Sequence, residues 1–217
     1  MDKDKFKAAL QKALEEKGKR KFTQSIDVIC NLKEIELKNT EHQIDFFLTL
    51  PHTKGKGAKV CAFVGPELHD EAKKELDAVY EVHDFDKFKD KPKEIKKLAD
   101  SYDYFVAQAN VMPQVATVFG KVLGPRGKMP NPKAGCVVPP KASLGPLKEK
   151  LNNTIRVTAK TSASIKAVVG KEDADIDALV ENIMALYNSI ISHTPQGHNN
   201  IKELFVKLTM GTLIKVE

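Results

Sequence analysis

Near the C-terminus the chain reads Phe205-Val206-Lys207-Leu208-Thr209-Met210-Gly211-Thr212-Leu213-Ile214-Lys215-Val216. Apolar and polar residues alternate before Gly211, and the apolar character resumes after it, which predicts a strand, a tight corner and a second strand. Gly211 permits a positive φ and lets another backbone come close. The corner offers a thioether, a hydroxyl and backbone donors, but no acid, base or nucleophile. These groups suit contact with an RNA backbone, and they suit equally an ordinary hairpin that closes a sheet.

Working outward, the same one-sided alternation predicts strands at 22–32, 42–50, 155–160 and 164–169. In the first of these strands one face carries Phe22, Ile26, Val28, Cys30 and Leu32, with Ile29 as an exception. Apolar stripes at helical spacing predict helices at 3–17 and 175–192. Clean alternation indicates a sheet with one packed face and one face open to water or to a partner.

The middle of the chain has a different pattern. Val60–Val64 and Tyr104–Ala107 are continuous apolar runs, which are typical of parallel strands covered on both faces. Helices are predicted between and after them, at about 68–78, 93–101 and 111–122. We therefore predict two domains: residues 1–53 and 154–217 form a discontinuous α+β domain, and residues 54–153 form an inserted α/β domain with βαβ units. Two adjacent linkers favour relative domain motion.

Composition narrows the function classes. The chain has 217 residues, a formal net charge of +6 and 41% hydrophobic residues, which fits a folded protein with a polyanionic partner such as nucleic acid. Three cysteines without a CxxC pair argue against a disulfide framework and a zinc ribbon, and the histidines form no metal-ligand motif, so no metal is expected. The N-terminus has no apolar signal core, and no apolar run approaches the roughly 18 residues that span a bilayer. We expect a cytoplasmic protein without membrane contact.

A second informative segment, Leu123-Gly124-Pro125-Arg126-Gly127-Lys128-Met129-Pro130-Asn131-Pro132-Lys133-Ala134-Gly135, lies in the inserted domain. Its prolines predict an ordered loop that holds Arg126, Lys128 and Lys133 on a stiff support. The loop lacks the Walker spacing, because Val122 stands at the first glycine position and Met129 at the Ser/Thr position. Contact with RNA phosphates and packing against the neighbouring domain both remain open. An α/β enzyme that binds a phosphorylated ligand at the 124–135 loop is the alternative, and a basic scaffold without RNA preference is a third reading.

The 123–135 segment, together with other motifs, resembles the family of the first protein of the large ribosomal subunit, which belongs to the mobile stalk near the exit site. The other motifs are Lys21-Phe22-Thr23-Gln24-Ser25, Leu50-Pro51-His52, Val169-Gly170-Lys171 and Leu208-Thr209-Met210-Gly211. The resemblance covers essentially the whole chain and is closest to archaeal members. It implies a split β-α-β type discontinuous domain with an inserted three-layer, Rossmann-like α/β domain.

The resemblance also implies a non-enzymatic function without a cofactor or catalytic residue. The partners would be the large-subunit rRNA stalk, deacylated tRNA at the exit site and the protein's own mRNA, whose translation it would repress; the free protein would be a monomer. The implied rRNA-binding residues are Lys21, Phe22, Ser25, Thr158, Lys160, Lys166, Lys207, Thr209, Met210 and Gly211. Arg126, Lys128 and Lys133 would make secondary RNA or interdomain contacts.

Two positions depart from the family pattern. Thr212 stands where a proline often follows the Met-Gly pair, which weakens the expectation of a stiff corner. Glu203 stands where bacterial members commonly have a serine that contacts RNA, so Glu203 is not among the expected contacts.

Overall fold

The computed structural model describes residues 3–18, 20–39, 42–89 and 91–216. It contains both antiparallel and parallel sheets, which confirms the predicted mixed α/β and α+β class. The chain divides into two compact units. Met1–Lys56 and Asn153–Glu217 form the discontinuous unit, and Gly57–Asn152 form the inserted unit.

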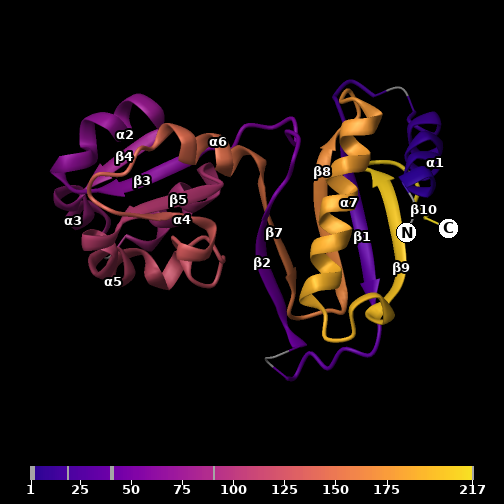
Figure 1. The fold of residues 1–217 in the computed structure, drawn as a ribbon. Coiled ribbons are helices and arrows are strands. Elements are labelled where there is room, and N and C mark those ends of the chain that lie inside the picture. Colours follow the sequence, from indigo (N-terminus) through magenta and orange to yellow (C-terminus); the bar gives the residue numbers. More distant parts are fainter. Residues whose placement is uncertain (1–2, 19, 40–41, 90, 217) are drawn as a thin grey trace. The chain divides into compact units, whose positions relative to one another are not determined.

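An antiparallel sheet in the order β10-β9-β1-β8 forms the centre of the discontinuous unit. Its strands are β1 (Ser25–Leu32), β8 (Ser164–Lys171), β9 (Ile201–Leu208) and β10 (Ile214–Lys215). Helices α1 (Lys3–Glu15) and α7 (Ile176–His193) pack on this unit's core, and α7 lies over the sheet, along its strands, in Figure 1. A separate two-stranded sheet pairs β2 (Ile44–Thr49) with β7 (Thr154–Ala159), and a short helix η6 (Gly197–Asn200) precedes β9.

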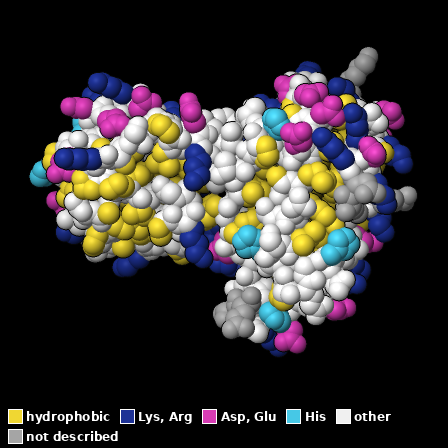
Figure 2. Space-filling view, in the orientation of Figure 1, with side chains coloured by type: hydrophobic (Ala, Val, Ile, Leu, Met, Phe, Trp, Pro, Cys, Tyr) yellow, Lys and Arg dark blue, Asp and Glu magenta, His cyan; other side chains and the backbone are white. Residues whose placement is uncertain are grey.

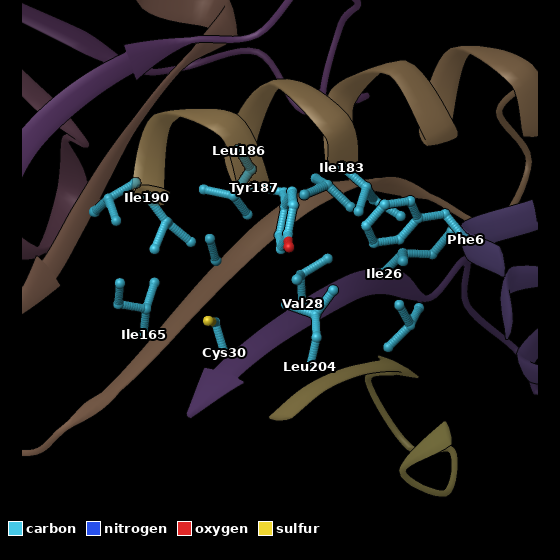
Figure 3. Close-up of a cluster of buried hydrophobic side chains, with 14 of the residues drawn as sticks. Phe6, Ile26, Val28, Cys30, Ile165, Ile183, Leu186, Tyr187, Ile190 and Leu204 are labelled. Carbon is cyan, nitrogen blue, oxygen red and sulfur yellow. The ribbon is translucent and has the colours of Figure 1, made fainter. Parts of the chain in front are cut away.

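One face of the β10-β9-β1-β8 sheet supplies the core. The even-numbered residues of β1 and residues Leu204, Val206 and Leu208 of β9 are buried against the core stripe of α7. Figure 3 shows Val28 and Leu204 facing Ile183 of α7. Full burial of such side chains contributes about 1.5–3 kcal/mol each relative to exposure. Packing is close at Gly170, because a Cβ there would lie 2.3 Å from Leu179 Cδ2 and would force this buried side chain to shift. The glycine thus lets the Leu179 side chain of α7 pack directly on β8.

The other face of this sheet is open. Buried and half-buried residues alternate along β1, and the half-buried set is Ser25, Asp27, Ile29 and Asn31. The exception at Ile29 is thus explained, since Ile29 lies on the open face opposite Phe205 of β9. The prediction that Phe22 shares the packed face with Ile26 is wrong. Phe22 precedes β1 and is 53% exposed.

The inserted unit contains a parallel sheet in the order β4-β3-β5-β6, with helices on both sides in Figure 1. Its strands are β3 (Val60–Val64), β4 (Ala78–Glu81), β5 (Tyr104–Gln108) and β6 (Val137–Val138). Its helices are α2 (His69–Glu75), α3 (Phe85–Phe88), α4 (Pro92–Ser101), α5 (Met112–Leu123) and α6 (Gly145–Asn153). Short helical turns η2 (Pro66–Leu68), η3 (Val82–Asp84), η4 (Ala109–Val111) and η5 (Pro132–Ala134) complete the unit.

Aromatic packing forms one side of the inserted unit. Phe63 stacks against Phe105 at a centroid distance of 5.7 Å and meets Phe85 edge-on at 5.6 Å.

The predicted strand at 60–64 is confirmed with the same bounds. The predicted helix at 68–78 is wrong at its end, because the helix stops at Glu75 and residues 78–81 form β4.

Candidate nucleic-acid interface

Thr209 fastens the corner to the start of β1. Its amide donates to the Ser25 carbonyl at 3.0 Å, and its Oγ1 accepts from the Ser25 amide at 3.0 Å and donates to the Ser25 carbonyl at 3.2 Å. A threonine hydroxyl has one hydrogen to donate and two lone pairs. One lone pair of Thr209 Oγ1 therefore remains for a donor such as a ribose 2′-hydroxyl.

Gln24 supports the next residue of the corner. It is only 2% exposed, and its Oε1 accepts a hydrogen bond from the Met210 amide at 3.1 Å. Its carbonyl oxygen accepts from the Glu172 amide at 3.0 Å, which links the corner to the residue after β8. Sequence reasoning missed Gln24, because its partner lies at the other end of the chain.

Gly211 has a different role from the one expected. Its φ is not among the positive values found at Gly55, Gly127, Gly135 and Gly197, so the corner does not use the positive φ that a glycine permits. A Cβ at Gly211 would lie 3.1 Å from Leu208 Cβ and 3.4 Å from the Leu208 backbone nitrogen, so the neighbour that approaches closely belongs to the same turn. Thr212 Oγ1 donates to the Glu16 carboxylate just after α1. The corner is thus tied down on both sides although it lacks the usual proline.

Exposed apolar side chains surround this network. Phe22, Met210 and Leu213 are 53%, 60% and 57% exposed, and with Val168 at 39% they are the exposed large hydrophobic residues of the part that the structure describes. Phe22 precedes β1, whereas Met210 and Leu213 lie between β9 and β10. Exposed apolar groups that gather beside a polar network mark an interaction site. Sequence analysis did not include Leu213 among the candidates.

Cations border the corner on the open face. Lys207 of β9 lies opposite Asp27 of β1, and Lys166 of β8 lies opposite Ile29. Lys21 is exposed directly before Phe22. Within the described ranges, the ammonium groups of Lys21, Lys166 and Lys207 have no hydrogen-bond or salt-bridge partner. They are therefore available to a polyanion.

Thr158 and Lys160 lie elsewhere. Thr158 is on β7 opposite Asp45 of β2, and Lys160 Nζ forms a salt bridge with Asp45 at 2.7 Å. Arg156 holds the same carboxylate through two hydrogen bonds of 2.9 Å and lowers the pKa of Asp45 to about 2. The structure thus places Thr158 on the two-stranded sheet and Lys160 directly after it, with the Lys160 charge partly neutralised.

The cations of the 123–135 loop differ from one another. Lys128 Nζ donates to the carbonyl oxygens of Ala99 and Tyr102 at 2.7 Å each, so it caps the C-terminal end of α4. Arg126 pairs with Asp100 on the same helix. Lys133 is exposed, and its ammonium has no partner in the described part of the chain. Lys128 and Arg126 are therefore engaged inside the inserted unit.

The charge of the α7 side of the molecule is mixed. Figure 2 shows acidic and basic side chains next to one another on that side, and the ion pairs Lys3–Glu181 and Lys7–Asp177 join α1 to α7 at 3.4 and 2.8 Å. A search of the described residues finds no group of histidine, cysteine and acidic side chains that could hold a metal ion. Among the described residues, no helix is both long and apolar enough to span a bilayer.

Comparisons with known proteins agree with this architecture. The model of the ribosomal protein L1p/L10e family matches residues 11–212. The large ribosomal subunit protein uL1 of Nanoarchaeum equitans is 41% identical over 95% of this chain and 97% of its own length. The uL1 proteins of Methanothermobacter thermautotrophicus and Thermococcus kodakarensis are 39% and 35% identical, over 96% and 100% of this chain and 96% and 98% of their own lengths. The chain therefore belongs to the ribosomal protein L1p/L10e family.

Proposed function

We propose that this protein is a structural constituent of the large ribosomal subunit that binds the rRNA of the stalk. Family membership and the names of the relatives support the ribosomal assignment and a ribosome-associated location in the cytoplasm. The RNA site is the corner surface, which we define as Lys21, Phe22, Ser25, Lys166, Lys207, Thr209, Met210 and Gly211. The observation that carries the proposal is the exposed Met210 held by buried Gln24 and by the Thr209–Ser25 bonds.

Each part of the corner surface has a distinct task. The free lone pair of Thr209 Oγ1 accepts from a 2′-hydroxyl, which distinguishes RNA from DNA. Met210 and Phe22 pack against sugar and base surfaces. Lys21, Lys166 and Lys207 neutralise phosphates and supply the salt-dependent part of the affinity. A fixed backbone lowers the entropy lost on binding, because the site does not have to order itself.

Two further activities belong to the same proposal. Deacylated tRNA at the exit site would contact the protein while the stalk moves, and an rRNA-like site in its own mRNA would occupy the corner surface and repress translation. Both rest on the family resemblance. Repression requires that the messenger and the rRNA compete for one site, so a substitution at Met210 should weaken both to a similar extent.

Competition binding tests the proposal. Labelled stalk RNA is challenged with unlabelled stalk RNA, bulk tRNA and random RNA at two salt concentrations. Strong preference for stalk RNA that survives the higher salt is expected, because shape and hydroxyl contacts depend less on salt than phosphate contacts do. Equal competition by every RNA would contradict specific binding of stalk RNA and would support only a basic protein that binds RNA without preference. Tight binding of a mononucleotide would favour the alternative of an enzyme with a phosphorylated ligand.

A further inference from the structure

An acidic residue, Asp27, lies inside the corner surface. It is two residues after Ser25 on the open face of β1, and its register partners are Lys207 on β9 and Val168 on β8. The β1–β8 ladder is irregular between Ile26 and Asp27, and such bulges commonly redirect a side chain. Asp27 is thus surrounded by residues proposed to contact RNA, although its charge has the same sign as a phosphate.

The Asp27 carboxylate has no hydrogen bond or salt bridge within the described residues. Its side chain is half-buried on the open face, and partial burial raises the pKa of this carboxyl, while the nearby Lys207 ammonium opposes the shift. A carboxylate that is partly desolvated without hydrogen-bond donors costs folding free energy. The Asp27 carboxylate is therefore a half-buried acceptor on the open face that no donor of the described residues occupies.

The other acidic residue named on this face, Glu203, is neutralised by a salt bridge. Glu203 of β9 shares the open face, opposite Asn31, but its carboxylate forms a salt bridge with Lys215 Nζ at 3.0 Å. The two acidic residues therefore differ, since the Glu203 carboxylate forms a salt bridge, whereas the Asp27 carboxylate forms neither a salt bridge nor a hydrogen bond among the described residues and has only the nearby charge of Lys207.

The chemistry of a carboxylate limits what it can contact on RNA. An ionised carboxylate only accepts hydrogen bonds, so it repels phosphates and requires an N–H or O–H donor. The Watson–Crick edge of guanine offers two parallel donors, N1–H and N2–H, which match the two oxygens of a carboxylate. Protein readers of RNA recognise unpaired bases through these edges.

A surface for the face of such a base lies beside Asp27. Ile29 and Phe205 are paired across β1 and β9, both are half-buried, and Val168 is 39% exposed on the neighbouring strand. Bases stack on aromatic and apolar side chains with little dependence on sequence. A base lying on this apolar surface would direct its edge toward Asp27.

We propose that Asp27 determines sequence specificity by accepting hydrogen bonds from the Watson–Crick edge of an unpaired guanine in the bound RNA. This inference rests on the proposed function of the corner surface and adds to it the base that is read. Phosphate contacts position the RNA, and Asp27 selects among sequences.

The test compares wild-type protein with Asp27→Asn on stalk RNAs in which single guanines are replaced by inosine, which lacks the N2 amino group. At one position the replacement should weaken wild-type binding about tenfold, as expected for loss of a good base contact. Asp27→Asn should bind the unmodified RNA about tenfold more weakly and lose sensitivity at that position only. The amide is nearly isosteric and uncharged, so the variant should fold at least as stably as the wild type.

Glu203→Gln is the matched control, because it removes a negative charge from the same face. It should keep the wild-type sensitivity to inosine at every position. If Asp27 only repels phosphates, both variants will bind more tightly, and the inference is overturned. The inference is also overturned if the binding of Asp27→Asn is weakened by inosine at the same positions as that of the wild type. It is overturned as well if the variant loses sensitivity to a 2′-deoxy substitution rather than to inosine. Failure of the wild type to prefer stalk RNA would overturn the proposed function, and the inference with it.

Discussion

The side-chain oxygen of Gln24 accepts the Met210 amide proton at 3.1 Å, across a sequence separation of 186 residues. This bond joins the segment before β1 to the corner after β9, and the Thr209–Ser25 bonds lie beside it. Buried Gln24 thereby fixes the backbone of a residue whose own side chain is 60% exposed. The corner combines a rigid backbone with an accessible side chain, as a preformed recognition site requires.

Gln24→Ala should destabilise the corner and weaken RNA binding together. The substitution leaves the Met210 amide without its partner, which costs about 1–3 kcal/mol of unfolding free energy if water cannot replace the lost acceptor. Denaturant unfolding and stalk-RNA binding measure the two effects. Gln114→Ala, at an exposed glutamine of α5, is the control and should change neither. Unaltered RNA affinity in Gln24→Ala would show that the Gln24 bond does not position Met210.

Lys128→Met should destabilise the inserted unit, because the carbonyl oxygens of Ala99 and Tyr102 lose a charged donor. Hydrogen bonds to charged groups contribute up to about 1.5–3 kcal/mol, and partial exposure reduces that value here. Lys133→Met removes the same charge from the same loop without breaking a hydrogen bond of the described structure, and should leave the melting temperature unchanged. Equal effects of the two substitutions would refute the capping role of Lys128.

The lowered pKa of Asp45 should make the unfolding free energy depend on pH. Its hydrogen bond with Arg156, more than that with Lys160, lowers the pKa of the folded state to about 2 from an ordinary value of 3.8. A lowered folded-state pKa adds stability that is fully present above the unfolded pKa and is lost as pH falls through the folded pKa. Asp45→Asn should therefore cost about 1 kcal/mol at pH 7 after allowance for solvent screening.

The difference in stability between wild type and Asp45→Asn should shrink as the pH falls from about 4 toward about 2, in urea unfolding at each pH. Asp86→Asn serves as the comparison, since Asp86 is exposed and its ion pair with Lys89 is long at 3.7 Å. A constant difference between wild type and Asp45→Asn over this range would contradict the assignment.

Sequence patterns predicted those parts of the fold that depend on local periodicity. Val60–Val64 reads as a buried parallel strand because all its residues are apolar, and β1 alternates because only one face packs against α7. The sequence does not predict the strand at 78–81, since its half-buried side chains show neither pattern clearly. Alternation alone predicts Phe22 on the packed face, because it does not show where a strand begins.

The candidate site was predicted less completely than the fold. Met210 and Phe22 could be proposed from motif resemblance, and both prove to be exposed. The roles of Gln24, Asp27 and Leu213 depend on which strands pair, and no local pattern encodes that pairing. Lys128 is the opposite case. Its charge indicates an RNA contact, but in the fold its ammonium group donates a hydrogen bond to a carbonyl oxygen of α4.

The most direct measurement compares the affinities of Met210→Ala and Arg126→Ala for stalk RNA, with wild type and Thr209→Val alongside. Met210→Ala and Thr209→Val should each weaken specific binding, by about 1 kcal/mol per lost contact, while the proteins remain folded. Arg126→Ala should have a smaller effect on specific binding, because Arg126 already pairs with Asp100. Unchanged affinity of both corner variants, or a larger loss in Arg126→Ala, would contradict the account and move the primary RNA site to the inserted unit.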